Sequence, residues 1–194
     1  MLGLLRILAW VNTTILRIGR QIAWMALAVM VFVILIQVVF RYVFNNALSW
    51  PDEAARFLML WMAALVAPSA FRWGGFVSID LVPQYFSGRV GILLNLVLLA
   101  LSLMVLIAAV GQGYSHTFGF GGNFDSSSLR LPLDLIGMES IKVKLRYMYG
   151  SLFVCVVLLI SIAVELILRS LILLFDEKAD LPSVDNPHQP IGAD

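Results

Sequence analysis

Residues 21–40 read QIAWMALAVMVFVILIQVVF, and no charged side chain lies between Arg20 and Arg41. A helix rises about 1.5 Å per residue, so about twenty apolar residues cross the hydrocarbon core of a bilayer, which is about 30 Å thick. The chain has 194 residues, of which 61% are hydrophobic and 13% are charged. Soluble domains are less apolar and carry about twice this share of charge. The sequence therefore predicts an integral membrane protein.

Three further apolar stretches predict transmembrane helices at about 50–72, 90–110 and 147–168. The predicted fold class is all-α, with four transmembrane helices that form one domain over residues 1–175. The remaining residues, 176–194, are polar and contain three prolines, which is typical of a disordered tail.

The segment before the first span, residues 4–19, is apolar but interrupted by polar side chains. On a helical wheel, three polar residues of this segment and the arginine that follows it lie on one face: Arg6, Thr13, Arg17 and Arg20. This pattern predicts an amphipathic helix that lies at the membrane interface. The alternative is that these residues extend the first span.

Charge gives a modest signal for orientation. The N-terminal arginines outnumber the single Arg41 on the other side of the first span, which favours a cytoplasmic N-terminus. An even number of spans then places both termini in the cytoplasm. The basic run KVKLR at 142–146 favours the opposite orientation. The net charge of +1 argues against a nucleic-acid partner.

Residues that could carry chemistry are scarce. The two histidines, His116 and His188, lie in a predicted loop and in the tail, whereas a membrane haem usually needs two facing imidazoles within the spans. We predict no catalytic, cofactor-binding or metal site and no enzyme activity.

The polar residues deep in the spans are predicted to form hydrogen bonds between helices rather than line a transport path: Gln37, Ser69, Asn95, Ser102 and Ser161. Apart from the interfacial acids of the second span, Glu165 is the one acid within a predicted span, and we expect it to pair with Arg169 four residues later, where the helix leaves the bilayer.

The richest polar cluster lies between the first two spans. It comprises Arg41, Asn45, Asn46, Trp50, Asp52, Glu53 and Arg56. One interpretation is an ordinary interfacial belt of aromatic and charged side chains. The other is a partner interface or structural pivot, in which an ion pair between Arg41 and Glu53 fixes the angle between the two spans.

Residues 37–82, QVVFRYVFNNALSWPDEAARFLMLWMAALVAPSAFRWGGFVSIDLV, resemble the small membrane subunit of tripartite ATP-independent periplasmic (TRAP) transporters. The matching positions are Arg41, Tyr42, Phe44, Asn45, Trp50, Asp52, Glu53 and Asp80. The C-terminal half departs from the family pattern, because residues 134–146, DLIGMESIKVKLR, are longer and more basic than the usual loop.

The resemblance implies a three-part importer in the bacterial inner membrane. A soluble periplasmic protein captures an organic anion, a carboxylate or sulfonate, and a large membrane subunit carries it with sodium ions. The small subunit is a scaffold for the large one. It holds no cofactor of its own, since the sodium sites are expected in its partner. Its expected partners are the large subunit, the periplasmic binding protein and membrane lipids.

The segment 114–146 is longer than two antiparallel spans need, and long loops are often functional. Within it, Asp125 and Arg130 are predicted to help dock the binding protein, and the alternative is a tolerated insertion. Two other functions stay open. The chain could form a small channel or transporter as a homo-oligomer, or it could anchor a redox enzyme to the membrane.

Overall fold

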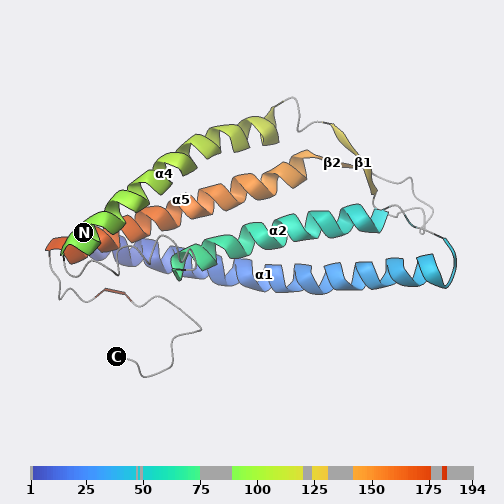
Figure 1. Ribbon diagram of the computed structural model, residues 1–194, viewed down its shortest axis with the longest axis horizontal. Helices are drawn as coiled ribbons and strands as arrows, with labels where there is room; N and C mark the ends of the chain where they lie inside the picture. Colours follow the sequence, from blue (N-terminus) through green and yellow to red (C-terminus); the bar gives the residue numbers. More distant parts are fainter. Residues whose placement is uncertain are drawn as a thin grey trace, which may run out of the picture. The chain divides into compact units, whose positions relative to one another are not determined.

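The computed structural model describes residues 2–46, 48, 50–74, 89–119, 124–130, 142–175 and 181–182. Four long helices account for most of them: α1 Leu2–Tyr42, α2 Trp50–Arg72, α4 Arg89–Phe118 and α5 Arg146–Phe175 (Figure 1). All four are long and apolar enough to cross a membrane. The predicted all-α fold with four membrane-spanning helices is therefore confirmed.

The helix bounds agree with the sequence prediction to different degrees. The segment 50–72 and α2 have the same bounds. By contrast, α4 continues past residue 110 to Phe118, and α5 continues past residue 168 to Phe175. Gly111 and Gly113 do not end α4, because Gly113 is buried where the helix approaches α5. A Cβ at Gly113 would lie 3.5 Å from Cδ2 of Phe153.

Residues 4–19 are helical as predicted, but they belong to α1, which runs without a break for 41 residues, or about 60 Å. This continuity agrees with the alternative in which they extend the first span. Where they lie relative to the bilayer stays a prediction. One stripe of α1 is buried at steps of three or four residues: Leu5, Ala9, Asn12, Leu16, Gly19 and Ala23.

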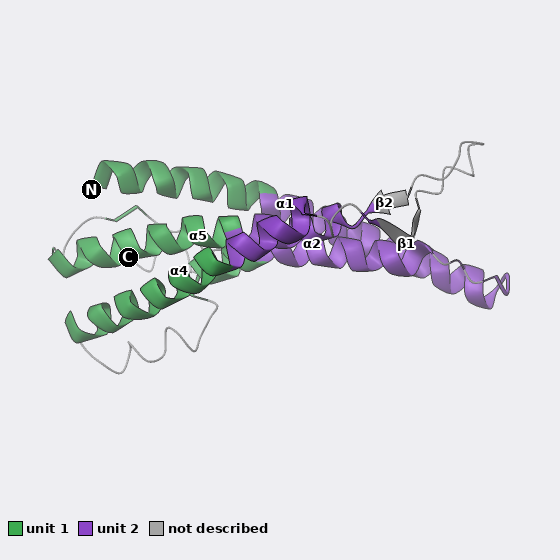
Figure 2. Cartoon of the chain, turned by 90° about the horizontal axis from the view of Figure 1, so that it is seen from above, with its two compact units in different colours: residues 1–18, 67–108, 157–194 green, residues 19–66, 109–156 purple. Residues whose placement is uncertain are grey.

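The chain forms two compact units, and each helix contributes to both (Figure 2). Unit 1 comprises Met1–Ile18, Ala67–Ala108 and Val157–Asp194. It therefore contains the N-terminal parts of α1 and α4 and the C-terminal parts of α2 and α5. Its apolar core consists of Leu16, Phe71, Leu99, Ile162 and Ala163.

Unit 2 comprises Gly19–Val66 and Ala109–Val156. Here α4 and α5 are joined by aromatic contacts, with ring centroids of Tyr114 and Phe118 at 6.3 and 6.0 Å from that of Phe153. The indole Nε1 of Trp61 in α2 donates a hydrogen bond to the Tyr147 carbonyl of α5 at 3.1 Å.

Unit 2 also contains a short ribbon that the sequence analysis did not predict. β1 Asp125–Arg130 and β2 Lys142–Lys144 pair antiparallel, with Asp125 opposite Lys144 and Arg130 opposite Lys142. The Leu145 N–H continues the pairing by donating to the Phe124 carbonyl at 3.0 Å. Part of the predicted loop 114–146 is therefore regular structure.

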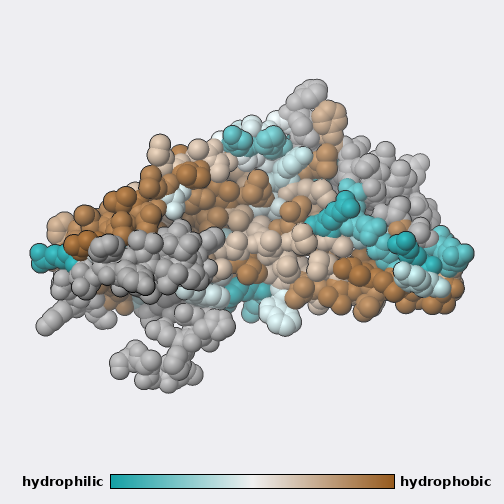
Figure 3. Space-filling view, in the orientation of Figure 1, coloured by the Kyte–Doolittle hydropathy of each residue, from teal (hydrophilic) through white to brown (hydrophobic). Residues whose placement is uncertain are grey.

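Much of the apolar surface faces outward. Figure 3 shows hydrophobic side chains over the part of α4 in unit 1 and, separately, over the part of α1 in unit 2. On α1 the exposed apolar residues include Ile34, Leu35, Val38, Val39 and Phe40. Such faces suit lipid or an apolar protein partner.

The close approach of α1 to α2 at Gly19 gives a first prediction. A Cβ at Gly19 would lie 3.6 Å from the Leu65 carbonyl oxygen and 3.7 Å from its Cδ2. That Cβ would already be in van der Waals contact, so the further atoms of a leucine side chain would press on Leu65, and we expect Gly19→Leu to lower the free energy of unfolding by about 1–3 kcal/mol. Thermal unfolding in detergent measures this loss. The control is Gly111→Leu, because a Cβ at Gly111 has no atom within 4 Å. Equal melting of both variants would contradict the packing.

Candidate functional site

The most unusual feature of unit 1 is a fully buried carboxylate, that of Glu165 in α5. Its Oε1 accepts hydrogen bonds from Nη2 of Arg72 at 2.7 Å and from Nη2 of Arg169 at 2.8 Å. Nε of each arginine also donates to this oxygen, at 3.2 and 3.1 Å. Both guanidinium groups are themselves buried. The predicted pair between Glu165 and Arg169 is therefore confirmed, and Arg72 from the last turn of α2 joins it.

The second carboxylate oxygen binds α1. Nδ2 of Asn12 donates to Oε2 of Glu165 at 2.8 Å, and the Ser161 hydroxyl donates to Oδ1 of Asn12 at 2.7 Å. Arg72 also reaches α1, because its Nη1 donates to the Thr13 hydroxyl at 2.7 Å and its Nη2 to the Ala9 carbonyl at 3.3 Å. We call the seven residues the Glu165 cluster: Ala9, Asn12, Thr13, Arg72, Ser161, Glu165 and Arg169.

The cluster ties three helices together with charge. A buried carboxylate is costly unless it is paired and hydrogen-bonded, and here both of its oxygens have donors. The geometry leaves an imbalance, because two guanidinium groups share one carboxylate. The three charged side chains therefore sum to +1. Removing the carboxylate would leave two buried cations without their counter-ion.

Arg169 also contacts the chain beyond α5. Its Nη1 donates to the Pro182 carbonyl at 2.8 Å. Residues 181–182 are the described part of the predicted tail, and the rest of 176–194 lies outside the described residues. Near the N-terminal end of α4, Nδ2 of Asn95 lies 3.5 Å from the Ser170 hydroxyl of α5, at the limit of a hydrogen bond.

Sequence reasoning missed the contributions of Arg72 and Asn12. They are separated from Glu165 by 93 and 153 residues, so no local spacing rule connects them. One signal was available. In a bundle whose consecutive helices are antiparallel, the start of α1 and the ends of α2 and α5 belong to the same side. Polar residues at these three ends can therefore meet.

The predicted pivot residues lie in unit 2, in the last turn of α1, in the turn that follows it and in the first two turns of α2. The guanidinium of Arg41 lies 6.0 Å from the ring centroid of Tyr42. Asp52 and Glu53 occupy the first turn of α2, where a helix favours acidic side chains. Trp50 and Glu53 are half-buried, whereas Asp52 and Arg56 are exposed. The ion pair between Arg41 and Glu53 stays a prediction.

Asn45 has a specific backbone role in the turn after α1. Its φ of 51° lies in the left-handed region, which asparagine tolerates better than most residues. This turn lets the Asn46 N–H donate to the Phe40 carbonyl at 3.0 Å. Ser49 precedes α2 and has the serine-to-acid spacing of a helix-capping box, but it lies outside the described residues.

The predicted docking residues Asp125 and Arg130 are the first and last residues of β1. The ribbon therefore holds their backbones at a fixed spacing opposite Lys144 and Lys142. Within the part of the chain that the structure describes, no group of three His, Cys, Asp or Glu side chains is placed to hold a metal ion. The exposed His116 ring lies 5.8 Å from that of Tyr149.

Four helices of membrane-spanning length, apolar on their outer faces and three of them tied by a buried ion cluster, define a multi-pass membrane protein. Residues 30–173 match the family described as tripartite ATP-independent periplasmic transporters, DctQ component. Since the match covers well over half of the chain, this chain belongs to that family and is the small subunit of a TRAP transporter. The family is a transporter component and not a family of enzymes, and it implies partner subunits. Comparison with curated proteins finds no match.

The Glu165 cluster generates the second prediction. Glu165→Gln keeps the shape of the side chain but removes the charge that Arg72 and Arg169 share. We expect the free energy of unfolding to fall by about 3–5 kcal/mol, the usual cost of breaking a buried ion pair. Thermal unfolding in detergent is the measurement. The control is Asp52→Asn, which changes an exposed carboxylate and should have little effect. Unfolding of Glu165→Gln at the wild-type temperature would show that the cluster does not tie the helices.

Proposed function

We propose that this chain is the scaffold subunit of a sodium-coupled importer of an organic anion, a carboxylate or sulfonate. In this scheme a soluble periplasmic protein delivers the anion, and the large membrane subunit moves it together with sodium ions. The sodium sites belong to the large subunit, and this chain holds no cofactor of its own. It lies in the bacterial inner membrane with both termini in the cytoplasm.

The proposal rests on how the buried carboxylate of Glu165 is bonded. The carboxylate of Glu165 is bound on both oxygens, by two arginines and by Asn12, at 2.7–2.8 Å. A carboxylate that carried an ion or a proton would need an oxygen open to a path. This one instead joins α1, α2 and α5. Such a use of charge favours a rigid support over a transport path within the chain.

Two surfaces support a role in binding partners. The exposed apolar residues of α1 in unit 2 suit contact with the large subunit or with membrane lipids. The pivot residues lie where α1 ends and α2 begins, beside the proposed periplasmic face. We assign them to contact with the large subunit: Arg41, Asn45, Trp50, Asp52, Glu53 and Arg56.

Assembly is the direct test, and it gives the third prediction. The tagged chain is co-expressed with the large subunit from its own operon and purified in detergent. We expect the large subunit to be recovered at about one copy per chain. Glu53→Ala should lower this recovery, because it removes a half-buried acid of the proposed contact. Reconstituted into liposomes with the binding protein, the wild-type complex should take up the binding protein's ligand only with a sodium gradient.

The control in this test is Lys178→Ala, a charged residue of the tail, which should leave recovery unchanged. Uptake by the chain alone would instead establish a self-contained transporter and overturn the scaffold role. A Glu53→Ala complex that assembles normally but selects a different anion would overturn the assignment of Glu53 to the partner contact.

The fourth prediction concerns docking of the binding protein on the β1–β2 ribbon. The ribbon brings the backbones of one acid and three basic residues together, a mixed-sign arrangement that suits a brief polar contact. The double charge reversal Asp125→Lys, Arg130→Glu should slow uptake when the binding protein is limiting. More binding protein should restore the rate in part, because charge complementarity acts mainly on association.

Charge reversal at Lys178 is the matched control, since the proposed topology puts the tail on the opposite side of the membrane. Uptake should then match the wild type at every concentration of binding protein. If the ribbon variant also does so while its complex is intact, the ribbon is a tolerated insertion.

A further inference from the structure

Unit 1 contains a hollow beside the Glu165 cluster, which we call the headgroup pocket. It has a volume of about 310 Å³, and its polar lining comes from Arg72, Arg169, Asn95 and Ser170. The two arginines are nine-tenths or more buried, with relative exposures of 5% and 8%. A pocket that two buried guanidinium groups line is suited to an anion.

Bonds to the described residues leave donors on both arginines. A guanidinium has five N–H groups. In bonds to described residues, Arg72 uses four of them and Arg169 three. One carboxylate balances the two charges, so the described charged groups of the cluster leave an excess of +1 at the pocket wall.

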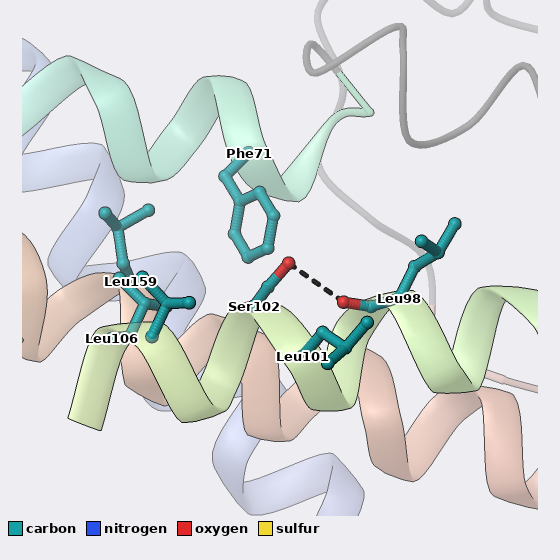
Figure 4. Close-up of a pocket in the computed structure, with 7 residues that line it drawn as sticks. Phe71, Leu98, Leu101, Ser102, Leu106 and Leu159 are labelled. Atoms are coloured by element: carbon teal, nitrogen blue, oxygen red, sulfur yellow. Dashed lines mark hydrogen bonds between the residues drawn. The ribbon is translucent and has the colours of Figure 1, made fainter. Parts of the chain in front are cut away.

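A second hollow, the acyl groove, adjoins the first. It has a volume of about 380 Å³ and is lined by side chains that include Leu98, Leu101, Val105 and Leu159. Figure 4 shows its one hydroxyl, that of Ser102, bonded at 2.9 Å to the carbonyl of Leu98. The described lining of the groove therefore offers no free side-chain donor. Phe71 lines both hollows and forms their common wall.

Along α4, the polar headgroup pocket comes first and the apolar acyl groove follows it toward the C-terminal end of the helix. Asn95 lies at the headgroup pocket, and the groove extends along α4 to Val105, about 15 Å further on. This length is half the thickness of the hydrocarbon core. The polar end lies near the ends of the helices, since Arg72 is the last residue of α2. Polar and apolar hollows in this order match the two parts of a phospholipid.

We propose that the two hollows together bind one anionic phospholipid. Its phosphate lies at Arg72 and Arg169 with Asn95 and Ser170 nearby, and one acyl chain lies in the groove past Phe71. Charge complementarity favours an anionic headgroup, because basic pockets between membrane helices attract such headgroups. The site does not depend on the proposed transport role.

The test uses the full-length chain, purified in detergent and depleted of lipid. Native mass spectrometry measures binding of phosphatidylglycerol and of phosphatidylcholine with the same acyl chains. We expect phosphatidylglycerol to bind about fivefold more tightly, the effect of one basic charge near an anionic lipid. Equal affinity for the two lipids would overturn the proposal.

A matched pair of variants tests the groove without disturbing the Glu165 cluster. Leu101 and Leu93 are both on α4 and are similarly exposed, at 56% and 54%, but only Leu101 lines the groove. Leu101→Trp should fill the groove and weaken phosphatidylglycerol binding about fivefold or more, whereas Leu93→Trp should leave it unchanged. Asn95→Leu should reduce the preference for the anionic lipid.

Two other occupants would be recognised by different results. If inorganic phosphate displaces the lipid and Leu101→Trp has no effect, the pocket binds a free anion and the lipid proposal is wrong. Acidic residues 176, 177 and 180 precede Leu181, which lines the pocket. If lipid binds only after Asp176→Asn, Glu177→Gln and Asp180→Asn are combined, the tail is the occupant and the proposal is overturned.

Discussion

The buried carboxylate of Glu165 sets the axial positions of three helices. It receives side-chain donors from α1 and α2, and from Arg169 of its own helix α5, at distances of 2.7–2.8 Å for the shortest bond from each. If α1 or α2 slid along its axis by one turn, its donor would move by about 5.4 Å. A much smaller shift is enough to break a hydrogen bond. Because an unpaired charge in an apolar environment is so costly, the alternative alignments of these helices are strongly disfavoured.

Unit 2 is held together by different forces. Its helices meet through small residues and rings, as where Gly19 allows α1 to approach Leu65 and Gly113 meets Phe153. Close packing at small residues is a common basis of helix association in membranes, where the hydrophobic effect does not drive helices together. Such contacts are short in range and adjust to small shifts, whereas the ion cluster of unit 1 permits one arrangement. The register of the helices in unit 1 is therefore specified by charge, and the contacts in unit 2 by shape.

The sequence was most informative where the signal is local. Uncharged stretches located the helices, and α2 has the predicted bounds because Pro51 and the acids of its first turn mark one end and Arg72 the other. The spacing of Glu165 and Arg169 predicted their pair. The predicted span 90–110 is shorter than α4, which continues to Phe118 through two glycines because Gly113 packs against Phe153 of α5, a contact that no local pattern indicates. The ribbon was missed because Lys142–Lys144 is a strand only through its distant partner β1.

For the candidate site, local rules identified one of its two ion pairs. Arg72 was placed at a helix end and Asn12 on an interfacial helix, and only the packing of α1 and α2 against α5 brings them to Glu165. The same packing explains why an arginine at the end of α2 is buried instead of extending to the headgroups, as arginine usually does. This arginine shares the single carboxylate of Glu165 with Arg169, so the three side chains keep one net positive charge. The cluster thus aligns the helices and at the same time leaves a positive wall at the end of the bundle, so one arrangement of three charged side chains has both a structural and an electrostatic consequence.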